Sequence, residues 1–277
     1  MADENIERLK KWKQKASLLS VFNGYKIDIE NKKFIQYIGE ESIVTVPEGI
    51  EILNNACFSN NRHVEEIRLP KSLKHIESMA FRDCKRLNKI TIPSGVDNIS
   101  SYAFMNCERL TRVTIEDGVE EIQTGCFYGC SSLETIEMPN SIEYIGKMAF
   151  ANCSSLENIR LSNSITELND SVFDGCRSLE EISLPESIDI LEQGCFSNCF
   201  VLKEIKIPDE VRCLPKQCFQ CCYSLEKVTL GKQMLIIDEE CFLNCESLTD
   251  INATLDMMID STSFKGCDRL DTSGFCV

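Results

Sequence analysis

Cysteine thiols are the most numerous groups in this sequence that could carry chemistry, with 17 among 277 residues. The densest group comprises Cys213, Cys218, Cys221 and Cys222. Cys218-Phe-Gln-Cys221 has the C-x-x-C spacing of zinc sites and of thiol redox centres. A zinc site needs a second such pair or nearby histidines, and His63 and His75 lie far away in the sequence. A thiol-dependent or zinc-dependent activity is therefore only a remote alternative, and we expect no cofactor and no metal.

Other catalytic arrangements are not evident in the sequence. None of the spacings G-x-S-x-G, G-x-x-x-x-G-K and H-E-x-x-H occurs, so we expect a protein that is not an enzyme. The net charge of −15 argues against binding to nucleic acid or to anionic membranes. No apolar run approaches the roughly 18 residues of a membrane span. Residues 1–20 lack the central apolar run of a secretory signal, so we expect a cytoplasmic location.

The elements that must position the thiols follow an internal repeat with a constant period along most of the chain. Phenylalanine marks the repeat at Phe58, Phe81, Phe104, Phe127, Phe150, Phe173, Phe196, Phe219 and Phe242, and Phe264 follows one position earlier than the period predicts. Cysteine stands three residues after nearly every one of them, at Cys84, Cys107, Cys130, Cys153, Cys176, Cys199, Cys222, Cys245 and Cys267. One such unit cannot bury its own apolar face, so the repeat predicts a stack of coils.

Within each unit, an aliphatic pair such as Ile90 and Ile92 alternates with polar residues and predicts a short strand. A second aliphatic pair follows after a turn, as at Val96 and Ile99. Asn, Asp or Gly stands two residues after most of the phenylalanines. These residues tolerate a positive φ, so we expect each turn that contains Phe to close there.

The repeat also changes the interpretation of the cysteines. Fourteen of the 17 fall in two columns, three residues after Phe and one residue before it. The second column also accepts Ala, Val or Ser, which indicates a need for a small residue rather than for a thiol. Free cysteine is commonly buried and packs as a small apolar residue. We therefore interpret these fourteen as packing residues of a stacked core.

The unit resembles the BspA-like leucine-rich repeat, whose consensus runs close to I-x-x-x-A-F-x-x-C-x-x-L-x-x-I-x-I-P-x-S. Residues 145–164, IGKMAFANCSSLENIRLSNS, match it except for Ser162 at the usual proline. The resemblance implies an α/β, mainly β, solenoid of about ten coils. We expect a right-handed leucine-rich repeat superhelix with a concave parallel β-sheet and short helical or irregular convex turns. The family also implies a binding surface, and it leaves open an extracellular, adhesin-like protein on or secreted from a host-associated microbe.

The chain should divide into three parts. Residues 1–20 predict an N-terminal amphipathic helix, residues 21–42 a capping hairpin, and residues 43–277 the solenoid. The apolar face of the predicted helix carries Ile6, Leu9, Trp12 and Ala16. This helix either completes the cap or binds a partner or a second copy of the chain.

Two surface regions are candidates for binding a protein partner. Adjacent coils should bring together five basic side chains, Lys85, Arg86, Lys89, Arg109 and Arg112. Phe200, Val201 and Tyr223 fall at repeat positions that are otherwise polar, which indicates either a contact patch or packing against a neighbouring loop.

Charge is also distributed unevenly along the chain. Residues 1–112 contain 18 basic and 15 acidic groups, whereas residues 113–277 contain 11 basic and 29 acidic groups. This polarity either steers a charged partner or only solvates the surface. We expect a non-catalytic module that recognises another protein, as a monomer or as a weak dimer through an end of the solenoid.

Overall fold

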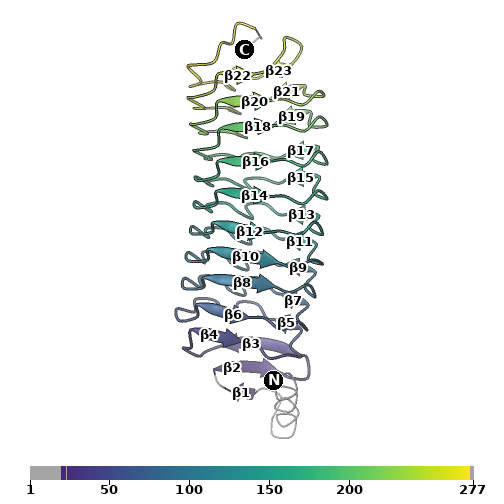
Figure 1. Cartoon of the computed structure of the whole chain (residues 1–277), viewed down its shortest axis with the longest axis vertical. Coiled ribbons are helices and arrows are strands. Elements are labelled where there is room, and N and C mark those ends of the chain that lie inside the picture. The colour runs from purple at the N-terminus through teal and green to yellow at the C-terminus, as the bar shows by residue number, and fades with distance from the viewer. Residues whose placement is uncertain (1–19, 23, 275–277) are drawn as a thin grey trace.

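The computed structural model describes residues 20–22 and 24–274, which form one elongated stack of coils (Figure 1). The chain enters the stack through three strands, β1 (Ser20–Phe22), β2 (Tyr25–Asp28) and β3 (Lys33–Tyr37). β2 pairs antiparallel with β3, as the alternation around residues 25–38 predicts, and its other edge pairs antiparallel with β1, which was not predicted. β3 then pairs in parallel with the first short strand of the repeat. The predicted helix of residues 1–20 lies almost wholly outside the described residues, and the three-part division of the chain stays a prediction.

The predicted strand of each repeat forms the even-numbered row in Figure 1. Its members are β4 (Ile43–Thr45), β6 (Glu66–Arg68), β8 (Lys89–Ile92), β10 (Arg112–Ile115), β12 (Thr135–Glu137), β14 (Asn158–Arg160), β16 (Glu181–Ser183), β18 (Glu204–Lys206), β20 (Lys227–Thr229) and β22 (Asp250–Ile251). Paired neighbours run in parallel and are offset along the chain by one repeat, as in Arg112 opposite Lys89. The second residue of these strands, such as Ile90, points into the core, and the flanking residues point outward.

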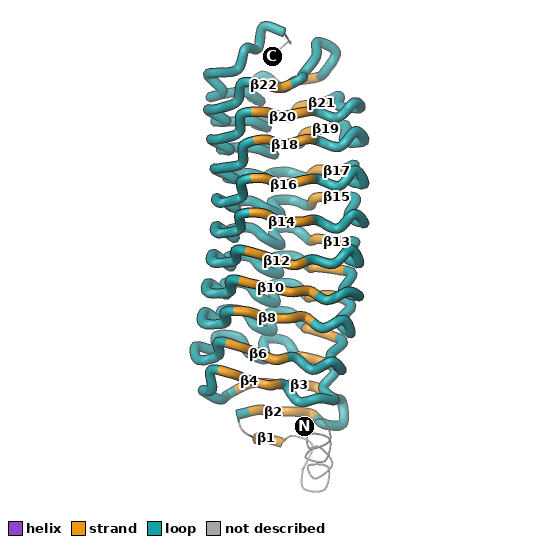
Figure 2. The backbone as a smooth tube through the Cα atoms, in the orientation of Figure 1, coloured by secondary structure: helices purple, strands orange, loops and turns teal. Residues whose placement is uncertain are grey.

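A second row of parallel strands was not predicted. It contains β5 (Ile52–Leu53), β7 (His75–Ile76), β9 (Asn98–Ile99), β11 (Glu121–Ile122), β13 (Tyr144–Ile145), β15 (Glu167–Leu168), β17 (Ile190–Leu191), β19 (Cys213–Leu214), β21 (Ile236–Ile237) and β23 (Met258–Ile259). Each of these strands has only two residues, one facing outward and one inward, so the sequence shows no alternation that would reveal it. Figure 2 shows both rows of strands along the length of the stack.

The turns that carry phenylalanine complete each coil. Of the two expected forms, short helical or irregular turns, the helical one is wrong. No helix occurs in the described residues. Positive φ angles two residues before and two residues after Phe interrupt any helix, as at Met148 (φ 55°) and Asn152 (φ 61°). The Phe N–H instead donates to the carbonyl of the residue before Phe in the next coil, at 2.8 to 3.0 Å. These turns therefore join neighbouring coils through backbone hydrogen bonds, as paired β-strands do, although the turns are not strands.

The phenylalanine side chains form a continuous stack through the centre of the molecule. Eleven rings from Phe34 to Phe264 follow one another with centroids 4.8 to 5.7 Å apart and planes within 2° to 21° of parallel. Parallel rings at this separation are offset, which is the favourable arrangement for aromatic quadrupoles. Phe34 comes from β3, so the hairpin contributes a ring to the stack and covers its first coil.

Candidate functional site

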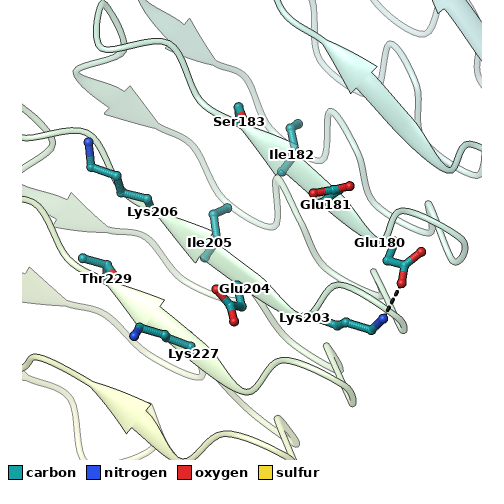
Figure 3. Close-up of a pocket in the computed structure, with 10 residues that line it drawn as sticks. All are labelled: Glu180, Glu181, Ile182, Ser183, Lys203, Glu204, Ile205, Lys206, Lys227 and Thr229. Carbon is teal, nitrogen blue, oxygen red and sulfur yellow. Dashed lines mark hydrogen bonds and ion pairs between the residues drawn. The ribbon is translucent and has the colours of Figure 1, made fainter.

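The outward face of the even-numbered sheet is polar and internally ion-paired. A shallow depression over β16, β18 and β20 is bordered by alternating acidic and basic side chains (Figure 3). Lys203 binds Glu180 and thereby lowers the pKa of that carboxyl. Lys206 lies 2.6 Å from Glu186, and Lys227 lies 3.2 Å from Asp250. Most charged side chains on this face are therefore already ion-paired or hydrogen-bonded within the chain.

The five basic residues predicted as a patch do lie on adjacent coils, but three of them are already ion-paired. Lys85 lies 2.7 Å from Glu108, Arg86 binds Glu65, and Lys89 lies 3.6 Å from Glu66. Within the described part of the chain, Arg109 and Arg112 form no ion pair. The positive potential of the patch is therefore concentrated on these two arginines.

The aromatic candidates form a compact cluster on the turn that follows the core cysteine. The rings of Phe200 and Tyr223 lie 5.1 Å apart at an angle of 46°. The guanidinium of Arg177 lies 5.2 Å from the centre of the Phe200 ring, a distance that favours a cation–π contact. Val201 and Tyr223 are 38% and 39% exposed. We call these four residues the aromatic cluster.

The same turn in neighbouring coils carries only polar residues. The positions equivalent to Arg177, Phe200 and Tyr223 hold Glu108, Ser131, Ser154 and Glu246 in other coils. The three positions follow one another on successive coils, so the coil spacing itself places a cation and two rings in a row. A hydrogen bond with the Cys221 thiol raises the pKa of Tyr223.

The thiols do not converge on one centre. All 16 described cysteines are free, and 14 of them are buried. Cys218 of the C-x-x-C pair is buried with its sulfur 3.5 Å from that of Cys195, whereas Cys221 is partly exposed on the turn. Cys213 lies on β19 and faces outward. Among the described residues, no group of three or more His, Cys, Asp or Glu side chains is arranged to hold a metal ion.

Each thiol three residues after Phe makes a hydrogen bond that the packing interpretation did not foresee. The nine thiols from Cys84 to Cys267 donate to the Phe carbonyl of the preceding coil at 3.1 to 3.3 Å. Burial raises the pKa of the Cys84 thiol to about 12. This column therefore uses its sulfur as a donor, and the Cys84 thiol stays protonated at neutral pH.

An apolar row on the odd-numbered strands, partly to largely exposed, was not predicted from the sequence. The outward residue of each odd-numbered strand is polar or partly polar from β7 to β15, but it is apolar on the last four strands. We call these four residues the apolar stripe: Ile190, Cys213, Ile236 and Met258. Ile190 is 45% exposed and Met258 is 66% exposed. The sequence does show a change from polar to apolar residues at this repeat position, since earlier coils hold Glu121 and Glu167 there. The change becomes meaningful only once the short strands show that the position faces outward.

Comparisons with known proteins concern the repeat and the fold. A family model described as "BspA type Leucine rich repeat region" matches residues 27–157 and 143–271. A leucine-rich repeat protein from Bacteroides ovatus is 24% identical with a TM-score of 0.72, covering 92% of this chain and 72% of that one. One from Eubacterium ventriosum is 18% identical with a TM-score of 0.55, covering 81% of this chain and 76% of that one. A leucine rich cell surface protein from Faecalibacterium prausnitzii is 21% identical with a TM-score of 0.41, covering 93% and 94%.

Two further findings bear on function. No curated protein matches the sequence. Within residues 20–22 and 24–274, no helix has the length and apolar character that crossing a membrane would need. The cytoplasmic location expected from the sequence finds no support in these comparisons.

Proposed function

Because the chain belongs to the BspA type leucine-rich repeat family, we propose that it is a non-catalytic binding module that recognises another protein through the aromatic cluster. The carrying observation is the row formed by Arg177, Phe200 and Tyr223 on three successive coils. Arginine and tyrosine are among the residue types that dominate binding energy at protein interfaces. The solenoid presents them on a frame whose buried side-chain nitrogen and oxygen atoms are all hydrogen-bonded in the described residues.

The rigidity of this frame supports the proposal energetically. Fixing a flexible side chain on binding costs about 0.5 to 1.5 kcal/mol. The rings of Phe200 and Tyr223 already hold each other, and Arg177 lies over one of them, so part of this cost is met before a partner arrives. A cluster ordered in advance can therefore bind more tightly than the same residues on a mobile loop.

A double substitution tests the proposal. Phe200→Ser with Tyr223→Ser introduces the residue that equivalent positions carry at Ser131 and Ser154, so the coil geometry should be kept. Losing interface residues of this kind costs about 2 kcal/mol or more, which is at least a tenfold loss in affinity. The measurement is quantitative affinity capture from an extract of the native host, followed by a titration of the captured protein.

The matched control is Glu246→Ser, which changes the equivalent turn one coil further on. We expect one protein to be retained by the wild type and by this control, but lost by the double variant. Reversing Arg109 and Arg112 to glutamate tests the alternative, in which charge steers the partner. If charge steers it, the reversal should slow association, and the effect should be smaller at high salt. If the wild type and the double variant enriched every captured protein equally, the proposed role of the aromatic cluster would be wrong.

The other functional alternatives remain proposals of lower rank. A surface or secreted, adhesin-like role rests on the family alone, and fractionation of native cells separates it from a cytoplasmic role. A thiol or zinc-dependent activity has less support, since the C-x-x-C pair has one buried and one partly exposed member. Metal analysis of the purified protein and a native thiol titration decide that alternative.

A further inference from the structure

The apolar stripe runs parallel to the long axis of the stack, across the last four odd-numbered strands. Cys213 lies opposite Ile236, and Ile236 lies opposite Met258 in the strand register. Leu235, beside Ile236, is 52% exposed and widens the stripe. With parallel strands about 4.8 Å apart, three steps from β17 to β23 give the stripe a length of about 14 Å. Single exposed apolar residues scattered over a surface are ordinary, but a contiguous row of this length indicates a contact surface.

Carboxylates border the stripe. Glu192 and Asp238 each follow one of its strands by one residue, and Asp260 holds the equivalent place after β23. All three side chains are exposed, and within the described residues none of them forms an ion pair. Burial raises the pKa of the Cys213 thiol, and the charges of Asp238 and Glu192 raise it further, which places both carboxylates close to the stripe. The stripe therefore suits a partner that is apolar along one line and basic beside it.

Residues 3–19 of the chain itself have this chemistry. The sequence predicts a helix there with an apolar line through Ile6, Leu9, Trp12 and Ala16. The residues between them include Arg8, Lys10, Lys11, Lys13 and Lys15. On a helix, the ten steps from Ile6 to Ala16 rise about 15 Å, which matches the length of the stripe. The apolar line and the rise of this predicted helix match the stripe, and Arg8, Lys10 and Lys15 would lie on either side of the line, where they suit the bordering carboxylates.

A copy of the chain cannot readily place this helix on its own stripe. Ser20 begins β1, and nine strand steps of about 4.8 Å separate β1 from β17, or about 43 Å. A helix over residues 3–19 is only about 25 Å long. A contact between this predicted helix and the stripe therefore requires two copies.

We propose that residues 3–19 of one copy dock as a helix on the apolar stripe of a second copy, so that the protein associates head to tail. The interface joins two different surfaces, so an open assembly keeps one free stripe at one end and one free helix at the other unless the chain of copies closes into a ring. Association should therefore continue beyond a dimer as concentration rises. This proposal uses a different surface from the aromatic cluster, and either one can fail without the other.

The test uses the full chain under reducing conditions, with mass measured by sedimentation from low micromolar to about 200 µM. Trp12 is the only tryptophan, so its emission reports the docking directly. We expect the mass to rise with concentration while the emission shifts to shorter wavelength. The stripe variant Ile190→Glu/Ile236→Glu carries the residue found at Glu121 and Glu167, and it should weaken association at least tenfold. The helix variant Trp12→Ser should do the same.

Mixing the stripe variant with the helix variant is the decisive experiment. The stripe variant keeps an intact helix, and Trp12→Ser keeps an intact stripe, so together they should form a one-to-one dimer that cannot grow. Tyr144→Ser, on an outward position two coils before the stripe, is the matched control and should associate like the wild type. Three results would overturn the proposal: a wild type that stays monomeric with unchanged emission, a mixture that stays monomeric, or variants that associate as the wild type does. The last result would point to contact through the ends of the solenoid.

Discussion

Each thiol of the column from Cys84 to Cys267, three residues after a core phenylalanine, connects two coils through one hydrogen bond. Phe81, for example, accepts the N–H of Cys84 in its own coil at 3.1 Å and the thiol of Cys107 in the next coil at 3.2 Å. Both lone pairs of a buried carbonyl are thereby used, where an unmet acceptor would cost about 1 to 3 kcal/mol. Sequence reasoning correctly placed these cysteines in the core, but it could not predict the bond, because the acceptor belongs to another coil.

Buried thiols make alkaline stability a prediction at the scale of single residues. Burial raises the pKa of Cys84, Cys107 and Cys153 above the ordinary value of 9.0. Above pH 9 the unfolded chain therefore loses thiol protons that the folded protein keeps, so the free energy of unfolding falls as pH rises. Each such thiol contributes a slope of up to about 1.4 kcal/mol per pH unit until its folded pKa is reached.

We expect the urea midpoint under reducing conditions to be level from pH 7 to about pH 8.5 and to fall steeply from about pH 9 to pH 11. Cys153→Ala/Cys176→Ala should lower stability near neutral pH and make the alkaline decline shallower. Equal slopes in the variant and the wild type would contradict a thiol origin of the decline.

At the scale of elements, the sequence revealed only what its periodicity encodes. The even-numbered strands and the closing residue of each Phe turn were predicted, because alternation and Asn or Gly mark them. The left-handed residue two positions before Phe was missed, since Met79, Tyr102 and Met148 carry no such signal. The helical alternative for these turns was wrong for the same reason. Here the hydrogen bonds to the next coil override local preference, and they cannot be read from one unit.

Glycines in this left-handed column give a prediction with an internal comparison. Gly194 has φ of 63°, and a Cβ there would meet only ordinary contacts, with Ser171 Oγ at 3.4 Å. Gly125 has φ of 59°, but its Cβ would lie 2.4 Å from Tyr102 Cε1. Gly194→Ala should therefore cost about 1 to 2 kcal/mol from backbone strain alone. Gly125→Ala should cost clearly more, as measured by chemical denaturation, and equal losses would show that the Tyr102 ring moves aside freely.

At the scale of the whole molecule, the two ends of the stack differ. The first coil is covered by the hairpin, which adds Phe34 to the ring stack and pairs β3 with β5. The last coil buries its strands less completely: Ile251 and Ile259 are only partly buried, whereas Val228 and Ile237 in the coil before are at most 1% exposed. Stability in such a stack is a sum of neighbour contacts, so the final coil should open most readily.

Hydrogen exchange checks this asymmetry. The amides of β22 and β23 should exchange faster than those of β10 and β11 in the centre, because opening the last coil breaks contacts on one side only. The amides of β5, under the hairpin, should be protected more nearly like the centre. The same protection at β5, β10 and β22 would mean that the stack opens as one cooperative unit.

The constant register between coils also has an evolutionary consequence. The Phe turns of neighbouring coils repeat the same hydrogen bond, so duplicating or losing one unit within the stack should leave the geometry of the remaining coils unchanged. Such an event would shift the aromatic cluster and the apolar stripe away from or toward the N-terminal hairpin by one rise of about 4.8 Å. Descendants of this chain can therefore adjust the distance between the N-terminal hairpin and these two contact surfaces in fixed steps without redesigning either surface.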